Sequence, residues 1–325
     1  MKDYIDIFTV LGQRLASFGS DTDSQRIIEQ AIEANPWFTH CDICCAVDAI
    51  RSQMLDETKL RLWMADYNTI SHTERVAVIM AGNIPLVGFF DLMCVVMAGH
   101  ECHVKLSSKD TVLMRFIIDE LKSIDSSIPI FDYQADQHYD KVIATGGDDA
   151  NRYFEEHFNT TRRLLRGSRH SVAILDGNES DADIEALVKD ITTYSGMGCR
   201  SVSMIFALRS KQPILKECCA ANAKLARNIA SMRALYTMQG ERFADYGGFL
   251  LVEGNDFPTS LTNITLCLYD DLKDVRQWLD ANDERIQCVV TNIEGVERSV
   301  AFGLAQYPTL WDYADGVDTM RFLLD

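Results

Sequence analysis

Residues 75–110 read RVAVIMAGNIPLVGFFDLMCVVMAGHECHVKLSSKD and carry the strongest indication of the protein's architecture. It begins with a short apolar run, passes through a loop that contains Asn83 and Pro85 into a helical pattern, and returns to a second short run that ends at Lys105. Short apolar runs that alternate with helical patterns are typical of parallel strands joined by crossover helices. The stretch therefore predicts a strand-helix-strand unit of a parallel sheet.

The same alternation extends along most of the chain. Strand-like runs and helical patterns follow one another through residues 112–158, 169–208 and 263–293, with one long helix expected over 212–238. Residues 1–70 carry apolar residues at three- and four-residue spacing and predict a layer of helices. We therefore expect an α/β protein with helices on both faces of a parallel sheet. A length of 325 residues is enough for two domains.

The composition excludes several classes of function. Forty-eight acidic residues against thirty-one Lys and Arg give a net charge of -17, which disfavours binding to nucleic acid or anionic membranes. No segment approaches the roughly 18 uninterrupted apolar residues of a membrane span. The first residues lack the basic and then apolar pattern of a secretory signal, and ten cysteines suit a reducing compartment. We expect a cytoplasmic protein with free thiols.

Polar residues and glycines follow three of the predicted strands. Asn83 follows the first, Lys105 and Ser107 end the second, and Gly146 and Gly147 stand between a strand and a helix in KVIATGGDD. Ligands of a parallel sheet bind beyond the carboxyl ends of its strands. Glycines at a helix N-terminus let backbone N–H groups approach a phosphate, and a side-chain amide can donate to an oxyanion. Each signal alone is equally typical of an ordinary turn or helix cap.

The segment YSGMGCRSVS, residues 194–203, places Cys199 between a glycine and an arginine, ahead of an apolar run. A thiolate attacks carbonyl carbon well, and a nearby cation favours thiolate formation, so His170 and Arg200 are candidates to assist Cys199. The alternatives are structural. In these alternatives, Cys199 is a small buried residue, His170 is a hydrogen-bonded residue at the start of a strand, and Arg200 is a surface or ion-pair residue.

Taken in this order, the segments resemble the aldehyde dehydrogenase superfamily. GNIPLVG is similar to its P-W-N-x-P-L segment, VKLSSKD to its V-x-K-P-S strand end, and IATGGDDANRYF to its F-T-G-S turn and helix. GSRHSVAILDGNESDADIEALVKDITTYSGMGC is similar to its G-G-K-S, A-D-x-D and Q-x-C run. The likeness extends over about residues 75–206, with a looser match over 263–292.

The resemblance implies an aldehyde dehydrogenase-like fold and a role for each candidate residue. The fold has a helical N-terminal segment over 1–70, a Rossmann-like nicotinamide cofactor domain over 71–192 and an α/β catalytic domain over 193–325. Cofactor and nucleophile are then expected to share one cleft, since hydride must reach the carbon bound to the cysteine. The implied roles are nucleophile for Cys199, oxyanion-hole donor for Asn83, adenosine ribose ligand for Lys105, supported by Ser107, and pyrophosphate contact for Gly146 and Gly147.

Departures from the superfamily pattern indicate the direction of the reaction. Leu165, in RRLLRGSRHS, stands where aldehyde-oxidising members carry the glutamate that activates water in L-E-L-G-G. Without that base, an acyl-enzyme is better placed to be reduced than hydrolysed. RHSVAIL and YADGVDTMRFLLD are most similar to the acyl-CoA reductase branch related to the fatty acid reductase of luminescent bacteria. The resemblance implies NADPH-dependent reduction of an acyl-CoA, or a similar thioester, to an aldehyde, with NADH as an open alternative.

Two other functions remain as alternatives. A phosphate-ester reductase of the same superfamily would need a basic pocket for an acyl phosphate, which only TRRLLRGSR, residues 161–169, offers. A non-catalytic nucleotide-binding scaffold would fit the missing glutamates. The segments HCDICC and GHECH resemble metal-ligand spacing, but they lie in an amphipathic helical pattern and a short strand, so we expect buried small residues and no metal.

Several features stay open at the level of sequence. GERFADYGGFLLVEGNDFP contains no counterpart of the E-x-F-G-P glutamate that holds the nicotinamide ribose. The usual β-hairpin oligomerisation arm has no counterpart either, so a homo-oligomer would need another interface. The acyl chain, its delivery by CoA or by an acyl-supplying protein partner, and the role of the helical N-terminal segment also stay open.

Overall fold

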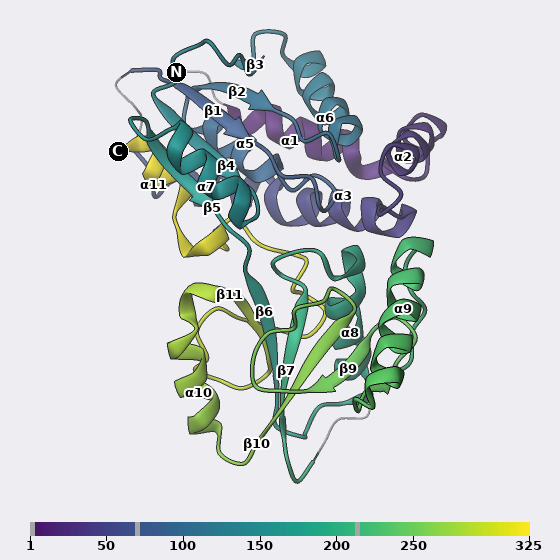
Figure 1. Ribbon diagram of the computed structural model, residues 1–325. Coiled ribbons are helices and arrows are strands. Elements are labelled where there is room, and N and C mark those ends of the chain that lie inside the picture. The colour runs from purple at the N-terminus through teal and green to yellow at the C-terminus, as the bar shows by residue number, and fades with distance from the viewer. Residues whose placement is uncertain (1–3, 69–71, 212–214) are drawn as a thin grey trace. The chain divides into compact units, whose positions relative to one another are not determined.

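The computed structural model describes residues 4–68, 72–211 and 215–325 (Figure 1). The chain divides into two compact units. The first consists of Met1–Ser168 together with Tyr307–Asp325, and the second of Arg169–Gln306. The C-terminal segment of the chain therefore belongs to the first unit.

The first unit is built on a five-stranded parallel sheet with strand order β3-β2-β1-β4-β5. Val76 and Val78 of β1 belong to the same core as the helices α5 and α6, whereas Ala77 and Ile79 belong to the core beneath α7. Successive side chains of a strand point to opposite faces, so the unbroken apolar run of β1 is buried on both. The prediction of helices on both faces is confirmed. The elements are β1 (Arg75–Ile79), α5 (Phe89–Met97), β2 (Glu101–Lys105), α6 (Thr111–Ile124), β3 (Ile130–Asp132), β4 (Lys141–Thr145), α7 (Asp148–His157) and β5 (Arg162–Arg166).

Helices α1 (Tyr4–Arg14), α2 (Thr22–Ala34), α3 (His40–Met54) and α4 (Glu57–Met64) form the layer predicted for the N-terminal segment. They share one core with α5 and α6, in which Phe8 meets Phe89 edge to face with 6.3 Å between ring centroids. Asp21, Thr39 and Asp56 cap α2, α3 and α4 by accepting backbone N–H bonds. The predicted end of the layer, at residue 70, lies outside the described residues.

The C-terminal segment is joined to the first unit by buried polar bonds. Arg166, only 3% exposed, donates from Nη2 to Asp91 Oδ1 at 2.9 Å and to Thr319 Oγ1 at 2.7 Å. Lys141 Nζ donates to the carbonyl of Leu323 at 2.5 Å, in the last turn of helix α11 (Thr319–Leu324) of the same segment. Buried charges need partners, so residues 307–325 complete the polar bonding of this unit.

The second unit is built on a seven-stranded sheet with order β12-β11-β6-β7-β10-β9-β8, in which only the β8–β9 pair is antiparallel. Ala173 and Ile205 face the core that includes helix α8, and Val172 and Phe206 face the core that includes α10. The elements are β6 (His170–Leu175), α8 (Asp181–Thr192), β7 (Val202–Leu208), α9 (Ala223–Gln239), β8 (Ala244–Asp245), β9 (Leu250–Glu253), β10 (Asn263–Tyr269), α10 (Leu272–Ala281), β11 (Ile286–Val290) and β12 (Ser299–Val300).

The structure differs from the sequence patterns in where units and one helix begin. The sequence places a boundary after residue 192, but β6 and α8 lie in the second unit because β6 pairs with β7 and β11. What each unit binds stays a prediction. The long helix expected from residue 212 begins only at Ala223, and its first three predicted residues, 212–214, lie outside the described ranges. Across those ranges, no helix has the length and apolar character needed to cross a bilayer.

The two segments rich in cysteine and histidine have ordinary structural environments. Cys41 is exposed on α3, and Cys44 Sγ lies 3.7 Å from His40 Nδ1. Cys102 is buried in β2, and His100 Nε2 lies 3.0 Å from the carbonyl oxygen of Leu323. All ten cysteines are thiols. Among the residues that the structure describes, no group of three His, Cys, Asp or Glu side chains is placed to hold a metal ion.

Candidate active site

The structure brings the five candidate residues of the first unit to one edge of its sheet. Asn83 follows β1, Lys105 and Ser107 end and follow β2, and Gly146 and Gly147 follow β4. These three strands are neighbours in the order β2-β1-β4 and run parallel, so their carboxyl ends lie side by side. Ligands of such sheets bind at this edge.

The turn that carries Asn83 is held in place by contacts with the loop that follows β2. Asp110 Oδ2 accepts a hydrogen bond from the backbone N–H of Leu86 at 2.7 Å, and Leu86 has the left-handed φ of 57° that an L-residue adopts only when its surroundings hold it there. A Cβ on Gly82 would lie 2.6 Å from Ser107 Oγ, so the two loops pack in direct contact. Only glycine allows that approach.

Asp110 is a supporting residue whose part the sequence did not reveal. It occupies the N-cap position of α6 but makes no side-chain cap there, because its carboxyl reaches the neighbouring turn instead. It is 3% exposed, and Oδ1 has no hydrogen-bond partner among the described residues. Burial raises the pKa of Asp110 to about 7, although the Leu86 N–H bond lowers it. The sequence signal, an Asp before a helix, is the same as that of an ordinary cap.

The glycine turn fits the phosphates of a dinucleotide. Gly147 is the N-cap of α7 and has no side chain with which to cap that helix, which suits backbone N–H groups of the first turn to an anion. A Cβ on Gly147 would meet nothing closer than Ser168 Oγ at 3.9 Å, which leaves the space open, whereas a Cβ on Gly146 would strike Ala150 Cβ at 2.7 Å. Lys105 is exposed at the end of β2, with Nζ 5.7 Å from the ring centroid of Tyr133. The donor set suits pyrophosphate and ribose.

Leu165 lies on β5 and packs against the apolar cluster that includes Ala77, Val142 and Phe154. Its backbone is in register with Ala144 of β4. Leu165, which the sequence resemblance aligns with the hydrolytic glutamate of aldehyde-oxidising enzymes, is therefore a half-buried residue at the edge of an apolar cluster.

In the second unit, Cys199 lies on a turn between a strained segment and β7. Tyr194, Ser195 and Gly196 all have left-handed backbone angles, with φ of 56°, 56° and 74°. Two such non-glycine residues in succession are uncommon and typical of functional turns. The half-buried Cys199 is held at its carbonyl, which accepts a hydrogen bond from Ser171 Oγ at 2.8 Å.

The two candidate assistants of Cys199 have structural partners. Arg200 Nε donates to the carbonyl of Ala305 at 2.6 Å. The N–H groups of Ala305 and Gly303 in turn donate to Asp190, at 3.1 Å and 2.6 Å. Burial raises the pKa of Asp190 to about 6, although the hydrogen bonds from these two N–H groups and the charge of Arg200 lower it. Arg200 therefore helps to fasten residues 303–305 beside the Cys199 turn.

His170 begins β6, and its Nδ1 lies 3.0 Å from Ser203 Oγ. The His170 ring stacks on the Phe257 ring with 4.2 Å between centroids. The Arg285 guanidinium also lies over the Phe257 ring, 4.7 Å from its centroid. Burial, and then the charge of Arg285, lower the pKa of His170. The imidazole is therefore mainly neutral near pH 7, which fits a hydrogen-bonded structural histidine better than a cation that assists Cys199.

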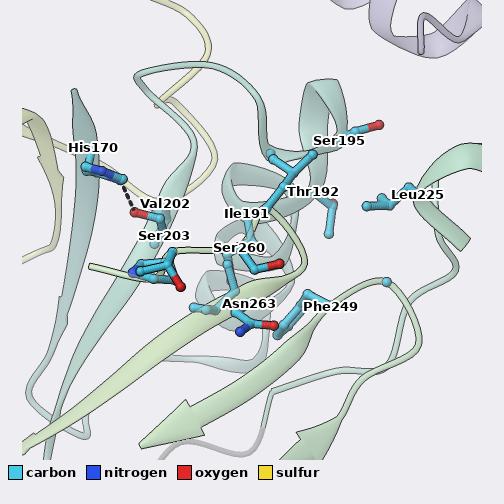
Figure 2. Close-up of a pocket in the computed structure, with 16 residues that line it drawn as sticks. His170, Ile191, Thr192, Ser195, Val202, Ser203, Leu225, Phe249, Ser260 and Asn263 are labelled. Carbon is cyan, nitrogen blue, oxygen red and sulfur yellow. Dashed lines mark hydrogen bonds between the residues drawn. The ribbon is translucent and has the colours of Figure 1, made fainter. Parts of the chain in front are cut away.

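A pocket of about 220 Å³ opens at the amino ends of β6, β7 and β10 in the second unit. Figure 2 shows His170 and Leu225 on opposite sides of it. Gly196 and Val202, which also line it, each stand three residues from Cys199. This pocket could not be predicted from the sequence, because its walls come from separate segments between residues 170 and 264.

Comparison with known proteins places these features in a family. The model of the acyl-CoA reductase (LuxC) family matches residues 50–243, more than half of the chain. The chain belongs to the acyl-CoA reductase (LuxC) family. The match includes both the glycine turn and the Cys199 turn, and it begins well before the segments on which the sequence resemblance was based. That resemblance is confirmed.

Curated relatives of this acyl-CoA reductase family member come from luminescent bacteria. Long-chain acyl-protein thioester reductase 2 of Photobacterium leiognathi is 24% identical over 194 residues, 54% of this chain and 39% of the relative. The long-chain acyl-protein thioester reductase of Aliivibrio fischeri is 25% identical over 157 residues, 42% of this chain and 32% of the relative. The chain thus matches less than half the length of these relatives.

Solved structures confirm the aldehyde dehydrogenase-like fold of the family member. Aldehyde dehydrogenase 21 of Physcomitrella patens, in complex with succinate, gives a TM-score of 0.68 at 10% identity and covers 100% of this chain and 84% of its own. An acetylating aldehyde dehydrogenase of Geobacillus thermoglucosidasius gives a TM-score of 0.63 at 10% identity, and the match covers 95% of this chain and 86% of that enzyme. At such identity the likeness extends to the fold alone.

Proposed function

We propose that this protein reduces an acyl thioester to an aldehyde, with Cys199 as the nucleophile and a reduced nicotinamide nucleotide, NADPH in preference to NADH, as the electron donor. The observation that carries the proposal is the Cys199 turn, with left-handed residues before it and its carbonyl fixed by Ser171. Membership of the acyl-CoA reductase family and the names of the luminescent-bacteria relatives support the same reaction.

The thiolate of Cys199 attacks the carbonyl carbon of the thioester, and the bond to the donor sulfur breaks. The donor leaves as a thiol, and the acyl group stays as a thioester of Cys199. The amide of Asn83 and the backbone N–H of Cys199 donate to the oxyanion that forms at each attack on this carbon. The hydride that reduces the acyl group is the chemistry that a reduced nicotinamide nucleotide supplies when it is bound. Collapse of the resulting thiohemiacetal releases the aldehyde and returns the cysteine thiol.

The carboxyl edge of the first sheet is the proposed cofactor site. Gly146 and Gly147, at the uncapped N-terminus of α7, receive the pyrophosphate on backbone N–H groups. Lys105 and Ser107 hold the adenosine ribose from the end of β2. Solved dehydrogenases of the same fold were crystallised with NAD+ or NADP, which is consistent with either nucleotide.

Reduction is favoured over oxidation to an acid because of Leu165. This side chain packs in an apolar cluster at the position where a hydrolytic glutamate would stand. A thioester on Cys199 then has no base from that position to activate water. The acyl group can be delivered by CoA or by an acyl-supplying protein, since the relatives are named for acyl-protein substrates.

Reduction of an acyl phosphate is the weaker candidate. Residues 161–169 would have to supply its basic pocket, but their arginines have other partners. Arg166 is buried against Asp91, and Arg163 Nη1 donates to the carbonyl of Phe158 at 3.2 Å. The Arg162 guanidinium lies 5.2 Å from the ring centroid of Phe322.

The test is NADPH oxidation followed by nicotinamide absorbance on a panel of acyl-CoAs, with trapped aldehyde identified as product. Wild-type protein and Cys199→Ala are assayed side by side, with Cys267→Ala as a matched half-buried cysteine in the same unit. We expect thioester-dependent oxidation that vanishes in Cys199→Ala alone. Binding of NADPH without turnover on any thioester would favour the scaffold function, and activity on acyl phosphates alone would favour the phosphate reductase.

A further inference from the structure

The pocket in the second unit has no function assigned so far, and its position ties it to Cys199. Its walls come from the end of α8, the first turn of α9, and the amino ends of β6, β7, β9 and β10. Consecutive Cα atoms are about 3.8 Å apart. The Cα atoms of Gly196 and Val202, three residues from Cys199, therefore lie within about 11 Å of the Cys199 Cα. That distance is within reach of an acyl chain bound to Cys199.

The lining of the pocket carries no formal charge. None of the described residues that line it is Asp, Glu, Lys or Arg. His170 is the titratable side chain in the wall, and its burial together with Arg285 favours the neutral imidazole. A carboxylate or an ammonium group would find no opposite charge there and would lose its hydration. The pocket therefore suits an uncharged ligand.

Most polar side chains of the lining are hydrogen-bonded to other residues of the second unit. Ser203 bonds His170, and Ser195 Oγ accepts from Asn222 Nδ2 at 2.9 Å. Ser260 Oγ lies 2.9 Å from Thr262 Oγ1. With these groups satisfied, apolar side chains give the pocket its binding surface. They are Ile191, Val202, Leu225, Phe249, Leu261 and Ile264.

The volume limits what the pocket can enclose. About 220 Å³ is below the roughly 300–1,000 Å³ of pockets that bury drug-sized ligands. A chain of several carbons fits such a volume, whereas a long fatty acyl chain would extend beyond it. The pocket is thus small for the long chains named for the curated relatives.

We propose that this pocket holds the acyl chain carried by Cys199 and selects uncharged chains of short to medium length. The inference rests on the proposed function, because it needs an acyl group on Cys199. Leu261, which is 39% exposed, stands at the accessible part of the wall, and Ile264 is buried within it. These two residues are the expected determinants of chain length.

The experiment measures kcat/KM of NADPH oxidation with acetyl-, butyryl-, hexanoyl-, octanoyl-, dodecanoyl- and palmitoyl-CoA, and with succinyl-CoA as the charged analogue. For wild-type protein we expect kcat/KM to rise about fourfold per methylene, equivalent to ~0.8 kcal/mol, while the chain still fits. It should then fall before palmitoyl-CoA, and succinyl-CoA should react more slowly than butyryl-CoA.

Two variants reduce the space, Ile264→Phe inside the pocket and Leu261→Trp at its exposed wall, so that one remains if the other fails to fold. Leu235→Trp on α9, at a side chain 44% exposed and outside the lining, is the matched control. We expect a loss of about tenfold or more with octanoyl-CoA, ~1.4 kcal/mol, and a change within about twofold with acetyl-CoA. The control should behave as wild type.

A palmitoyl-CoA preference, or an equal loss on all chains in both variants, would overturn the pocket assignment while leaving the reductase activity in place. Absence of turnover on every thioester in wild-type protein would instead remove the proposed function, and the inference with it.

Discussion

The carboxyl edge of the first sheet and the amino edge of the second sheet are built in different ways. At the first edge, the candidate residues stand at the ends of β1, β2 and β4 and in the turns that follow, and Gly147 leaves open space beside its turn. At the second edge, one cysteine stands on a turn beside an apolar pocket whose walls come from distant segments. Local sequence therefore specifies the first edge, whereas tertiary packing creates most of the second.

Asn83 stands at the first edge, but its proposed role is in the chemistry at Cys199 and not in cofactor binding. We expect Asn83→Ala to lower kcat about 100- to 1,000-fold, the usual loss for one oxyanion-hole donor. The dissociation constant for NADPH, measured by fluorescence titration, should change little. A loss confined to NADPH affinity would place Asn83 with the cofactor residues instead.

Asp110 tests how the Asn83 turn is supported. Its pKa in the folded protein, about 7, exceeds the 3.8 of an unperturbed Asp, mainly because of burial. A raised acid pKa means that the protonated form is favoured on folding, so this group's contribution to stability is present below about pH 4 and is lost as the pH rises to about 7. At ~1.4 kcal/mol per pKa unit, the loss is on the order of 4 kcal/mol.

Asp110→Asn keeps an oxygen that can accept the Leu86 N–H and carries no titrating proton. As the pH rises through this range, the free energy of unfolding of Asp110→Asn, measured by urea titration, should therefore increase relative to that of the wild-type protein. A constant difference between the two proteins would show that Asp110 does not titrate in this range.

The two glycines of the α7 turn should separate binding from stability. Gly147→Ala places its Cβ in open space, so we expect its melting temperature to equal that of wild type. We expect NADPH to bind this variant roughly tenfold more weakly, a loss of ~1.4 kcal/mol. Gly146→Ala drives its Cβ into Ala150 and should lower the melting temperature. Differential scanning fluorimetry with and without NADPH measures both effects. Unchanged NADPH affinity in a folded Gly147→Ala protein would remove this turn from the cofactor site.

The sequence predicted the elements whose signals are local. Strands β1, β2 and β4 are short apolar runs followed by Asn83, Lys105 and Gly146, and both the runs and the turns are visible in the chain. The edge strand β5 was not predicted because three of its five residues are arginines, which are unusual in a strand.

What the sequence could not predict depends on contacts between distant segments. Asp110 resembles a helix cap until its bond to Leu86, 24 positions away, is seen. The inclusion of β6 in the second unit depends on pairing with β11, more than a hundred residues later. The pocket likewise needs residues from His170 to Ile264 to be folded together. The roles of the site residues stay predictions for the experiments above.

Acylation of Cys199 can be tested by measuring the mass of the protein after exposure to octanoyl-CoA without NADPH, with the modified residue located by peptide mass spectrometry. We predict one octanoyl group on Cys199 and none on Cys199→Ala, with release of octanal and of the unmodified protein when NADPH is added. Acylation of a different cysteine, or aldehyde formation by Cys199→Ala at the wild-type rate, would contradict the account.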